Sequence, residues 1–597
     1  MKRIDQDVVE VQRWFNQAVT YEGEPYCIDY EQAAAVADDS FNTIVVARAG
    51  SGKTRTIVAK IIYLVAKCGV KPEEILVFVF NANAAREINE RLMKMRVDGE
   101  AVITEGVANT FHAFALKIVH RACRDERQCG KILAEEKDHY VVSILKEMMY
   151  AEDWREKIWR FVKNDWGEEV MEMQVSEEEL MGLAGMMTTF INRAQQKYLG
   201  GKRSLGEVAR EYLTQNEVSE REEVVIELGV ECFRRYHWYL LDDERKLDDF
   251  SDYGTDFNLI VSWASKIIGS GREEVNCLLA GKKYILIDEY QDFSQLFLAT
   301  VEAIRKVAVS AHLFVVGDDW QAINRFAGSE VEYFKGFERY FGGEDRNGNF
   351  GAGLDVDGLR GKVARYEITT NYRCDRMVVA TARRFMKKAM RESGEFRAFS
   401  RKNGKVVVIN PRETEVGYAL VPYDLRVSVC DRILREATER MGAKVVKKSM
   451  VRYLKTIVEI IRANLKMEKI LILHRNNETN IGGVSLVGFG RGLRWGLDRL
   501  GIMGSDEFLV KVQLMTMHKS KGLEADVVII LEADDGVIPK VHPDTILYRM
   551  FGETEKVALA DQKRLFYVAM TRAKHRLYIL SEGGGFIKHL GKGVEKW

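Results

Sequence analysis

The sequence of 597 residues predicts an α/β protein with two lobes. Short apolar runs recur along the chain, as in strands that are buried on both faces. In the N-terminal half these runs are 43–46, 75–80, 284–287 and 312–316. In the C-terminal half they are 405–409, 470–473, 512–515, 527–530 and 577–580. Two such sets, with helix-type stretches around them, predict two α/β halves in one chain.

The first apolar run leads into a glycine-rich loop and then into a helix-type stretch. The loop reads Ala47-Arg48-Ala49-Gly50-Ser51-Gly52-Lys53-Thr54, and the helical stretch is 57–62. Small residues allow backbone N–H groups to curl around phosphate oxygens, at the N-terminus of the following helix. Lys53 then reaches the β- and γ-phosphates, and the Thr54 hydroxyl holds Mg²⁺. The chain is therefore predicted to bind and hydrolyse a nucleoside triphosphate.

Composition limits the class of protein. Lys and Arg together number 89, as do Asp and Glu, so a uniformly basic coat is excluded but a local basic groove is not. The eight cysteines are scattered and form no C-x-x-C pair, which favours a reducing cytosol over a disulfide scaffold or zinc ribbon. No apolar run approaches the ~18 residues of a membrane span. We expect a cytoplasmic protein of three or four domains.

The residue composition changes at two places along the chain. Residues 115–250 are rich in charge and nearly free of proline, which predicts a helical insertion. Residues 342–361 carry seven glycines among charges, which predicts a flexible loop or hairpin near a domain boundary. The expected layout is 1–114 and 251–340 for the first lobe, 115–250 for the helical domain, 341–362 for the glycine-rich segment, and 363–597 for the second lobe.

Two carboxylates follow the strand-type run 284–287. Asp288 and Glu289 lie at its carboxyl end, where α/β sheets bind their ligands, and Gln291-Asp292 comes next. Asp288 is expected to hold Mg²⁺ through water, and Glu289 to orient and deprotonate the attacking water. After a phosphate-binding loop, this pair is expected to complete a site for phosphoryl transfer.

Together with further motifs, these residues resemble the superfamily 1 DNA helicases of the UvrD/Rep type. The motifs follow one another in order over most of the chain: Gln32 within 30–36, then 47–54, 80–87, 110–114, 288–292, 317–323, 371–373, 513–524 and 567–573. The resemblance implies two RecA-like P-loop NTPase lobes, with a helical domain inserted in the first and a reduced or absent insertion in the second, near 478–510.

The resemblance also implies roles for individual residues. The catalytic residues are Lys53, Asp288, Glu289, Gln321, Arg373 and Arg572. The nucleotide is held by Gln32, Ala49, Gly50, Ser51, Gly52, Lys53, Thr54, Arg55, Tyr372 and Glu524. The residues that meet DNA are Phe80, Asn81, Thr110, Phe111, His112, Phe326, Thr516 and His518. Arg373 and Arg572 belong to the second half, and Lys53 and Asp288 to the first, so ATP is expected between the lobes and its hydrolysis is expected to open and close them.

The sequence departs from the family in two respects. Asn324 stands where many relatives carry a stacking tyrosine, and Ala327 stands where an arginine is frequent. Only about forty residues separate 470–475 from the motif that begins at Gln513, so the large accessory domain is absent or reduced. The chain therefore looks closest to helicase IV-like members of the family. For Phe111 and Phe326, packing in the core is an open alternative to stacking on bases.

Two functions remain open. The first is an ATP- and Mg²⁺-dependent translocase on single-stranded DNA that moves 3′ to 5′ and unwinds tailed duplex DNA in repair, recombination or replication. The second is a nucleic-acid-gated ATPase motor within a larger complex that unwinds little alone. Its partner would be a nuclease in phage defence, a repair factor or RNA polymerase. The reduced insertion and the missing tyrosine motivate the second hypothesis.

Overall fold

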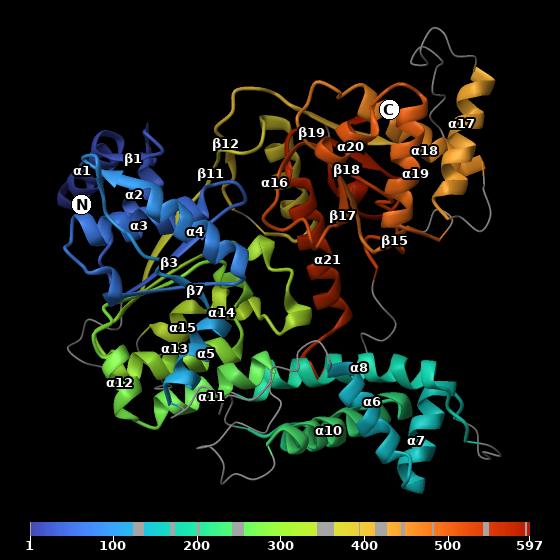
Figure 1. The fold of residues 1–597 in the computed structure, drawn as a ribbon, viewed down its shortest axis with the longest axis horizontal. Coiled ribbons are helices and arrows are strands. Elements are labelled where there is room, and N and C mark those ends of the chain that lie inside the picture. The colour runs from blue at the N-terminus through green and yellow to red at the C-terminus, as the bar shows by residue number, and fades with distance from the viewer. Residues whose placement is uncertain are drawn as a thin grey trace. The chain divides into compact units, whose positions relative to one another are not determined.

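The structure, a computed structural model, describes most of the chain. The described residues are 2–122, 137–166, 173–199, 203–241, 256–342, 363–392, 394–411, 427–442, 448–479, 483–540, 548–591 and 594–596. They form two compact units (Figure 1). Unit 1 comprises Met1–Val46, Lys53–Glu367 and Pro543–Thr554, and unit 2 comprises Ala47–Gly52, Ile368–His542 and Glu555–Trp597.

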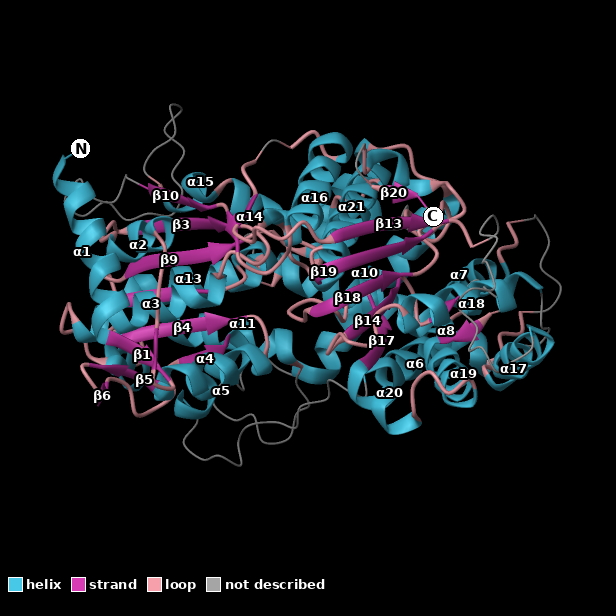
Figure 2. Ribbon diagram, turned by 90° about the horizontal axis from the view of Figure 1, so that it is seen from above, coloured by secondary structure: helices cyan, strands magenta, loops and turns pink. Residues whose placement is uncertain are grey.

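Unit 1 is built on a six-stranded sheet with the order β10-β3-β9-β8-β4-β7 (Figure 2). Its strands are β3 (Asn42–Ala47), β4 (Ile75–Val79), β7 (Ala108–Thr110), β8 (Tyr284–Ile287), β9 (His312–Gly317) and β10 (Val363–Ile368). β3, β9, β8, β4 and β7 pair in parallel. All residues of β3 and β4 are buried, because helices cover both faces of the sheet. A small antiparallel sheet adds β1 (Val19–Tyr21), β2 (Glu24–Pro25), β5 (Met95–Val97) and β6 (Glu100–Ala101).

The helices of unit 1 fall into two groups. Those around the sheet are α1 (Lys2–Ala18), α2 (Tyr30–Ala37), α3 (Lys53–Ala66), α4 (Ala82–Lys94), α5 (Phe111–Ala122), α11 (Phe257–Gly269), α12 (Glu273–Leu279), α13 (Gln295–Val307), α14 (Val331–Lys335) and α15 (Phe337–Phe341). The inserted helices are α6 (Lys137–Met148), α7 (Glu152–Lys163), α8 (Glu177–Tyr198), α9 (Leu205–Gln215) and α10 (Glu220–Leu241). The described part of the predicted insertion is thus helical, and its apolar residues join those around the sheet in one core.

Local sequence explains where several of these helices begin. Ser176 caps α8 and Ser204 caps α9, each in a reciprocal capping box with a glutamate three residues on. Asn81 caps α4 by accepting a hydrogen bond from the N–H of Ala84 over 2.9 Å. These caps satisfy N–H groups that the first helical turn leaves without partners.

Unit 2 contains a second six-stranded sheet, with the order β17-β14-β18-β19-β13-β20. Its strands are β13 (Lys405–Ile409), β14 (Ile470–His474), β17 (Val512–Thr516), β18 (Ala525–Ile530), β19 (Ala573–Leu580) and β20 (Glu595–Lys596), and all the neighbouring pairs are parallel. Two short pairs accompany it, β11 (Thr370–Asn371) with β12 (Arg397–Ala398) and β15 (Glu478–Thr479) with β16 (Val484–Ser485). The helices are α16 (Arg376–Ala389), α17 (Val427–Arg440), α18 (Lys448–Arg462), α19 (Leu486–Arg499), α20 (Ser505–Lys511) and α21 (Glu555–Met570).

The two parallel sheets confirm the predicted fold class of two α/β lobes. The domain boundaries stay a prediction, and we propose one amendment, since 363–368 forms an edge strand of the first sheet. The glycine-rich segment lies outside the described residues except for Phe341 and Gly342. No helix among the described residues is long and apolar enough to cross a membrane.

One part of unit 1 comes from far along the chain. Tyr548, Met550 and Phe551 are buried in the same core as the inserted helices. The ring of Phe551 lies 4.8 Å from that of Phe190 on α8. The guanidinium of Arg193, one turn further along α8, lies 3.8 Å from the ring centre of Tyr548 and 3.1 Å from Glu553. Residues 548–554 are therefore anchored on the helical domain, although α21, which follows directly, belongs to unit 2.

Candidate active site

The phosphate-binding loop connects the end of β3 to the start of α3. Gly50 and Gly52 have φ values of +68° and +90°, which residues with a Cβ rarely adopt. The N–H of Ser51 donates to the carbonyl of Arg48 over 3.0 Å and closes the loop. Lys53 and Thr54 begin α3, where N–H groups lack partners within the helix and attract anions. The loop has the backbone geometry that its sequence predicts for a phosphate site.

The two carboxylates lie at the carboxyl end of β8. Asp288 is buried, and one of its oxygens accepts a hydrogen bond from the N–H of Glu289 over 2.8 Å. Glu289 has a φ of 52°, an unusual backbone conformation for a residue with a side chain. Its carboxylate lies 3.5 Å from the ammonium of Lys53. The structure thus brings together the cation expected at the γ-phosphate and the base expected to activate water.

A chain of side-chain hydrogen bonds leads from Glu289 to Gln321. The amide nitrogen of Gln291 donates to Glu289, and its oxygen accepts the N–H of Asp318 over 2.7 Å. The amide nitrogen of Gln321 in turn donates to the carboxylate of Asp318 over 2.6 Å. Gln291, Asp318 and Gln321 are all buried, so these bonds are shielded from water. The chain joins the loops that follow two neighbouring strands, β8 and β9.

Two residues expected at the nucleotide have structural partners of their own. Gln32 is buried and forms a capping box with Asp29, whose N–H donates to the Gln32 side-chain oxygen over 3.1 Å. The guanidinium of Arg55 donates to the carbonyl of Cys27 over 2.8 Å and lies 5.0 Å from the ring centre of Tyr26. These contacts fix the Gln32 side chain at the start of α2 and the Arg55 side chain in the first turn of α3.

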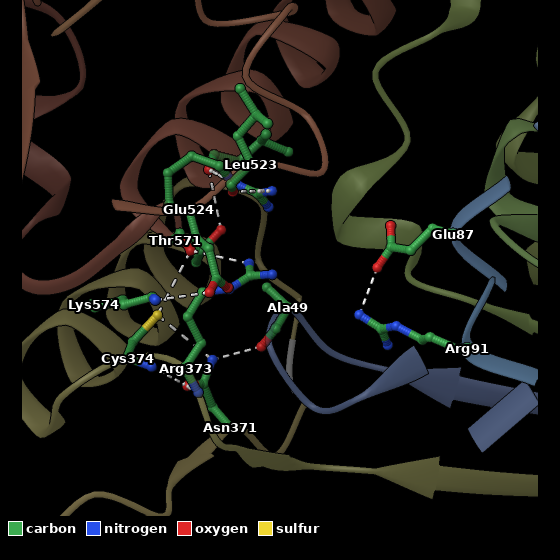
Figure 3. A network of polar contacts seen from close by, with 12 residues as sticks. Ala49, Glu87, Arg91, Asn371, Arg373, Cys374, Leu523, Glu524, Thr571 and Lys574 are labelled. Atoms are coloured by element: carbon green, nitrogen blue, oxygen red, sulfur yellow. Dashed lines mark hydrogen bonds and ion pairs between the residues drawn. The ribbon is translucent and has the colours of Figure 1, made fainter. Parts of the chain in front are cut away.

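In unit 2, Asn371 ties the glycine-rich loop to the residues that follow β11 (Figure 3). Its amide nitrogen donates to the carbonyl of Ala49 over 2.5 Å, and its oxygen accepts the N–H groups of Arg373 and Cys374. The N–H of Tyr372 donates to the carbonyl of Gly50 over 2.8 Å. The ring of Tyr372 is 42% exposed, with Phe399 at 4.9 Å, and is accessible to a flat ligand.

Arg373 is held by Glu524 of a later motif, and Lys574 contacts the same carboxylate (Figure 3). Its Nε lies 2.7 Å from the carboxylate of Glu524, and Lys574 lies 2.8 Å from the other oxygen of the same carboxylate. Burial alone raises the pKa of Glu524, but the hydrogen bonds from Lys574 and Arg373 outweigh it and hold this pKa below its usual value. Glu524 therefore stays ionised and positions Arg373.

Arg572 is almost fully buried. Its Nε donates to the carbonyl of Val568 over 3.0 Å, and its Nη1 donates to the carbonyl of Leu523 over 3.1 Å. Burial of a cation is costly unless it is paired or hydrogen-bonded, and these carbonyls reduce that cost. A guanidinium held in this way is already ordered, so the phosphate contact expected of Arg572 would cost little further side-chain entropy.

The residues expected to meet DNA have different environments. Phe80 and His112 are partly exposed, Asn81 is exposed, and the Thr110 hydroxyl accepts the N–H of Ala113 over 3.1 Å. Phe111 is buried and stacks on Phe78 and Phe297, each at 4.3 Å between ring centres. Its ring packs in the core, which favours the packing alternative, and its expected contact with DNA stays a prediction.

In unit 2, Thr516 and His518 lie just after the end of β17. The hydroxyl of Thr516 accepts the N–H of Lys519 over 3.4 Å. Burial, and secondarily the charge of Arg475, lower the pKa of His518 to about 4, so its imidazole is neutral at pH 7. The side chain of Phe326 lies outside the described part of the structure, so its expected role stays a prediction.

The sequence analysis named no role for Lys574 and used Gln291 only as part of a motif. Lys574 follows Arg572 by two residues, but nothing local indicates that it would meet Glu524, fifty positions earlier. Gln291 could have been found from its place two residues after Glu289. No sequence signal marks residues 548–554 as part of the unit that contains the inserted helices.

Comparison with known proteins places these motifs in a family. The family model of the UvrD/REP helicase N-terminal domain matches residues 28–342, and that of the UvrD-like helicase C-terminal domain matches residues 498–582. Similar proteins include DNA helicase IV of Escherichia coli, which is 26% identical over 92% of this chain and 67% of the relative. A probable DNA helicase of Mycoplasma pneumoniae is 24% identical over 93% of this chain and 83% of the relative. Yeast ATP-dependent DNA helicase SRS2 is 23% identical over 51% of this chain and 23% of its own length.

Proposed function

Because the chain belongs to the UvrD/Rep helicase family and is an ATP-hydrolysing DNA helicase, we propose that it moves 3′ to 5′ along single-stranded DNA. It would unwind tailed duplexes in DNA repair, recombination or replication. The observation that carries most weight is the pair of Lys53 and Glu289, 3.5 Å apart. These are the γ-phosphate cation and the water-activating base that ATP hydrolysis requires.

The site residues would divide the work of phosphoryl transfer. Backbone N–H groups of residues 49–54 bind the phosphates, and Lys53 stabilises charge on the γ-phosphate. Glu289, oriented by Gln291, takes a proton from the attacking water. Arg373 and Arg572 stabilise the charge that develops in the transition state. Gln32 and Arg55 border the nucleotide, and Tyr372 presents a ring for adenine.

Mg²⁺ is part of this proposal, since the oxygen donors expected to hold it are of the type it prefers. The Thr54 hydroxyl and the Asp288 carboxylate are hard ligands, and Asp288 is held in place by the N–H of Glu289. When bound with ATP, Mg²⁺ neutralises charge on the phosphates. Asp288 and Thr54 would orient it, and Glu289 would remain available for the proton.

The chain from Glu289 through Gln291 and Asp318 to Gln321 supports a coupling between ATP and DNA. Gln321 belongs to the motif that, by resemblance, joins the γ-phosphate to the DNA strand. Strand contacts in unit 1 would then come from Phe80, Asn81, Thr110, His112 and Phe326. In unit 2 they would come from Thr516 and His518. Phe111 would support this surface from within the core.

The first test is ATP hydrolysis with and without a single-stranded oligonucleotide, using wild type and Lys53→Ala. Stimulation by DNA that Lys53→Ala abolishes would support a DNA-coupled motor. Strand release is then compared for duplexes with a 3′ or a 5′ tail, using a labelled strand. Release from the 3′-tailed substrate alone supports the proposed direction. Release from the 5′-tailed substrate alone contradicts it, and no release at any protein concentration contradicts unwinding by the isolated chain.

A second candidate is a motor subunit of a larger complex, gated by nucleic acid and paired with a nuclease, repair factor or polymerase. The reduced insertion favours it: among the described residues between β14 and β17, only the β15–β16 hairpin, α19 and α20 occur. ATP hydrolysis without strand release, together with a protein that co-purifies from the native host, would support this candidate. We propose that the protein acts in the cytoplasm in both cases. The six cysteines that the structure describes are free thiols, which suits a reducing compartment.

A further inference from the structure

Residues 548–554, which we call the return segment, contact the loop 324–328 within unit 1. The guanidinium of Arg325 in the loop donates a hydrogen bond to the carbonyl of Gly552 in the return segment over 3.2 Å. The two residues are 227 positions apart in the sequence, and nothing local in either segment indicates that they meet. The return segment therefore supports a loop that belongs to a much earlier part of the chain.

Lys197 at the end of α8 connects the same two segments a second time. Its ammonium donates to the carbonyl of Phe551 over 3.0 Å and lies 3.0 Å from the carboxylate of Glu330, two residues after the loop. The side chains of Lys197 and Glu330 are 33% and 24% exposed, so this pair is partly shielded from water. The adjacent carbonyls of Phe551 and Gly552 thus each accept a hydrogen bond from a cation, which is stronger than one from a neutral donor.

The loop has a backbone conformation that depends on its surroundings. Arg325–Ala327 form one 3₁₀ turn, and the N–H of Gly328 donates to the carbonyl of Arg325 over 2.8 Å. Gly328 has a φ of +86°, and a Cβ there would lie 2.3 Å from the Cβ of Gln196 on α8. A single short turn has few hydrogen bonds of its own, so its contacts with α8 and with the return segment determine where it lies.

Three cations gather where the return segment meets α8 and the loop, namely Arg193, Lys197 and Arg325. Burial lowers the pKa of Arg193, the negative charge of Glu553 opposes this effect, and the positive charge of Arg325 adds to it. The two guanidinium groups therefore repel each other. The carboxylate of Glu553, 3.1 Å from Arg193, offsets this repulsion and so protects the hydrogen bond between Arg325 and Gly552.

We propose that the return segment is a positioning element for the loop 324–328, with Arg325 and Lys197 as positioning residues. The inference rests on the proposed function, in which Phe326 of this loop contacts the DNA strand. A loop that is held in place before the strand arrives loses less conformational entropy on binding. Removing the support should therefore weaken DNA binding and leave the hydrolysis of ATP in the absence of DNA unchanged.

The test is Glu553→Gln in the full chain, with the affinity for a fluorescein-labelled oligothymidylate measured by anisotropy. The substitution keeps the shape of the side chain and removes a negative charge, so attraction between charges alone would tighten binding of the anionic strand. If the return segment positions the loop, the affinity should instead fall about tenfold, the effect of losing one charge-assisted hydrogen bond. The rate of ATP hydrolysis without DNA should equal that of wild type.

Lys197→Met and Lys197→Arg separate positioning from direct contact with DNA. Methionine keeps an unbranched apolar side chain but has no ammonium, so this variant should also lose affinity, whereas arginine keeps the cation and should restore it. A phosphate contact made by Lys197 itself would lower the slope of log K against log salt by about 0.7 in the methionine variant. The loss of a stacking contact from a displaced loop leaves this slope unchanged.

The matched control is Glu177→Gln, which removes the exposed partner of Lys146 at the other end of α8 and should bind DNA as wild type does. Thermal melting checks that the variants are folded at the assay temperature, and Lys197→Met decides if Glu553→Gln is not. The inference is overturned if folded Glu553→Gln binds DNA as tightly as the control, or if Lys197→Met loses about 0.7 of the salt slope. If folded wild type does not bind the oligonucleotide, the proposed function fails together with this inference.

Discussion

The side-chain oxygen of Gln291 accepts a hydrogen bond from the backbone N–H of Asp318 over 2.7 Å. The same amide group donates from its nitrogen to Glu289. One side chain thus holds the expected catalytic base and also the loop that carries Gln321. A Cβ on Gly317 would lie 2.6 Å from this Gln291 oxygen, so the glycine leaves the space that the contact needs.

Gln291→Glu is expected to lower the DNA-stimulated rate of ATP hydrolysis by about 10²-fold. The substitution removes the N–H donor to Glu289 and places a second carboxylate beside it, which disfavours the ionised base. The measurement is kcat with saturating single-stranded DNA. Gln17→Glu, at an exposed position of α1, is the control for the added charge. An unchanged kcat in Gln291→Glu would show that Gln291 does not orient the base.

Gly50→Ala is expected to abolish most ATP hydrolysis because the methyl group has no space. The added Cβ would lie 2.6 Å from the Asn371 amide nitrogen and 2.8 Å from the Arg373 Cβ. Asn371 would have to move. The backbone N–H of Arg373 donates to the Asn371 side-chain oxygen, so the backbone at Arg373 would shift as well. Gly69→Ala is the control, since Gly69 has nearly the same φ of +66° but open space around its Cβ position. Both variants should lose about 1–2 kcal/mol of stability, and only Gly50→Ala should lose activity.

Arg193→Ala is expected to lower the free energy of unfolding by about 3 kcal/mol. Its side chain is 12% exposed and that of Glu553 is 15% exposed, so the substitution leaves a largely buried carboxylate without its cation. The stacking on Tyr548 is lost as well. Urea unfolding followed by circular dichroism provides the measurement. Arg203→Ala breaks an exposed pair with Glu211 and should change stability by less than about 1 kcal/mol, which serves as the comparison.

The lowered pKa of His518 predicts that the stability of the folded protein depends on pH in a specific way. Its pKa is about 4 in the folded protein, against 6.5 for the ordinary side chain. Between these values the unfolded chain binds more protons, so the free energy of unfolding falls as the pH falls through this window. Well above pH 6.5 the imidazole is neutral in both states and contributes no such loss.

The measurement compares wild type with His518→Gln, which keeps polarity and does not titrate. Between pH 7 and pH 4, wild type should lose about 3 kcal/mol more than the variant, from 1.36 kcal/mol for each unit of pKa difference. Equal losses in the two proteins would mean that His518 titrates normally in the folded state. The remaining histidines are common to both proteins and cancel in the comparison.

The sequence alone predicted those features that depend on neighbouring residues. The apolar runs became strands of two parallel sheets, and the glycine-rich loop took the φ values that phosphate binding needs. The fold class and the family are confirmed, whereas the roles of individual site residues and the domain boundaries stay predictions. Strand burial and loop geometry follow from local composition, so a single sequence is enough to infer them.

Other features were decided only by tertiary packing. Phe111 fits the pattern of a base-stacking motif, yet its ring is covered by Phe78 and Phe297. Lys574 reaches Glu524, and Tyr548 reaches Arg193, across spans of sequence with no local signal. Gly488 and Gly492 of α19 lie so close to the carbonyls of Met441 and Ala437 that a Cβ would have no space there. These outcomes depend on which side chains from distant parts of the sequence contact one another. Such contacts are determined by the packing of the whole chain rather than by any one segment.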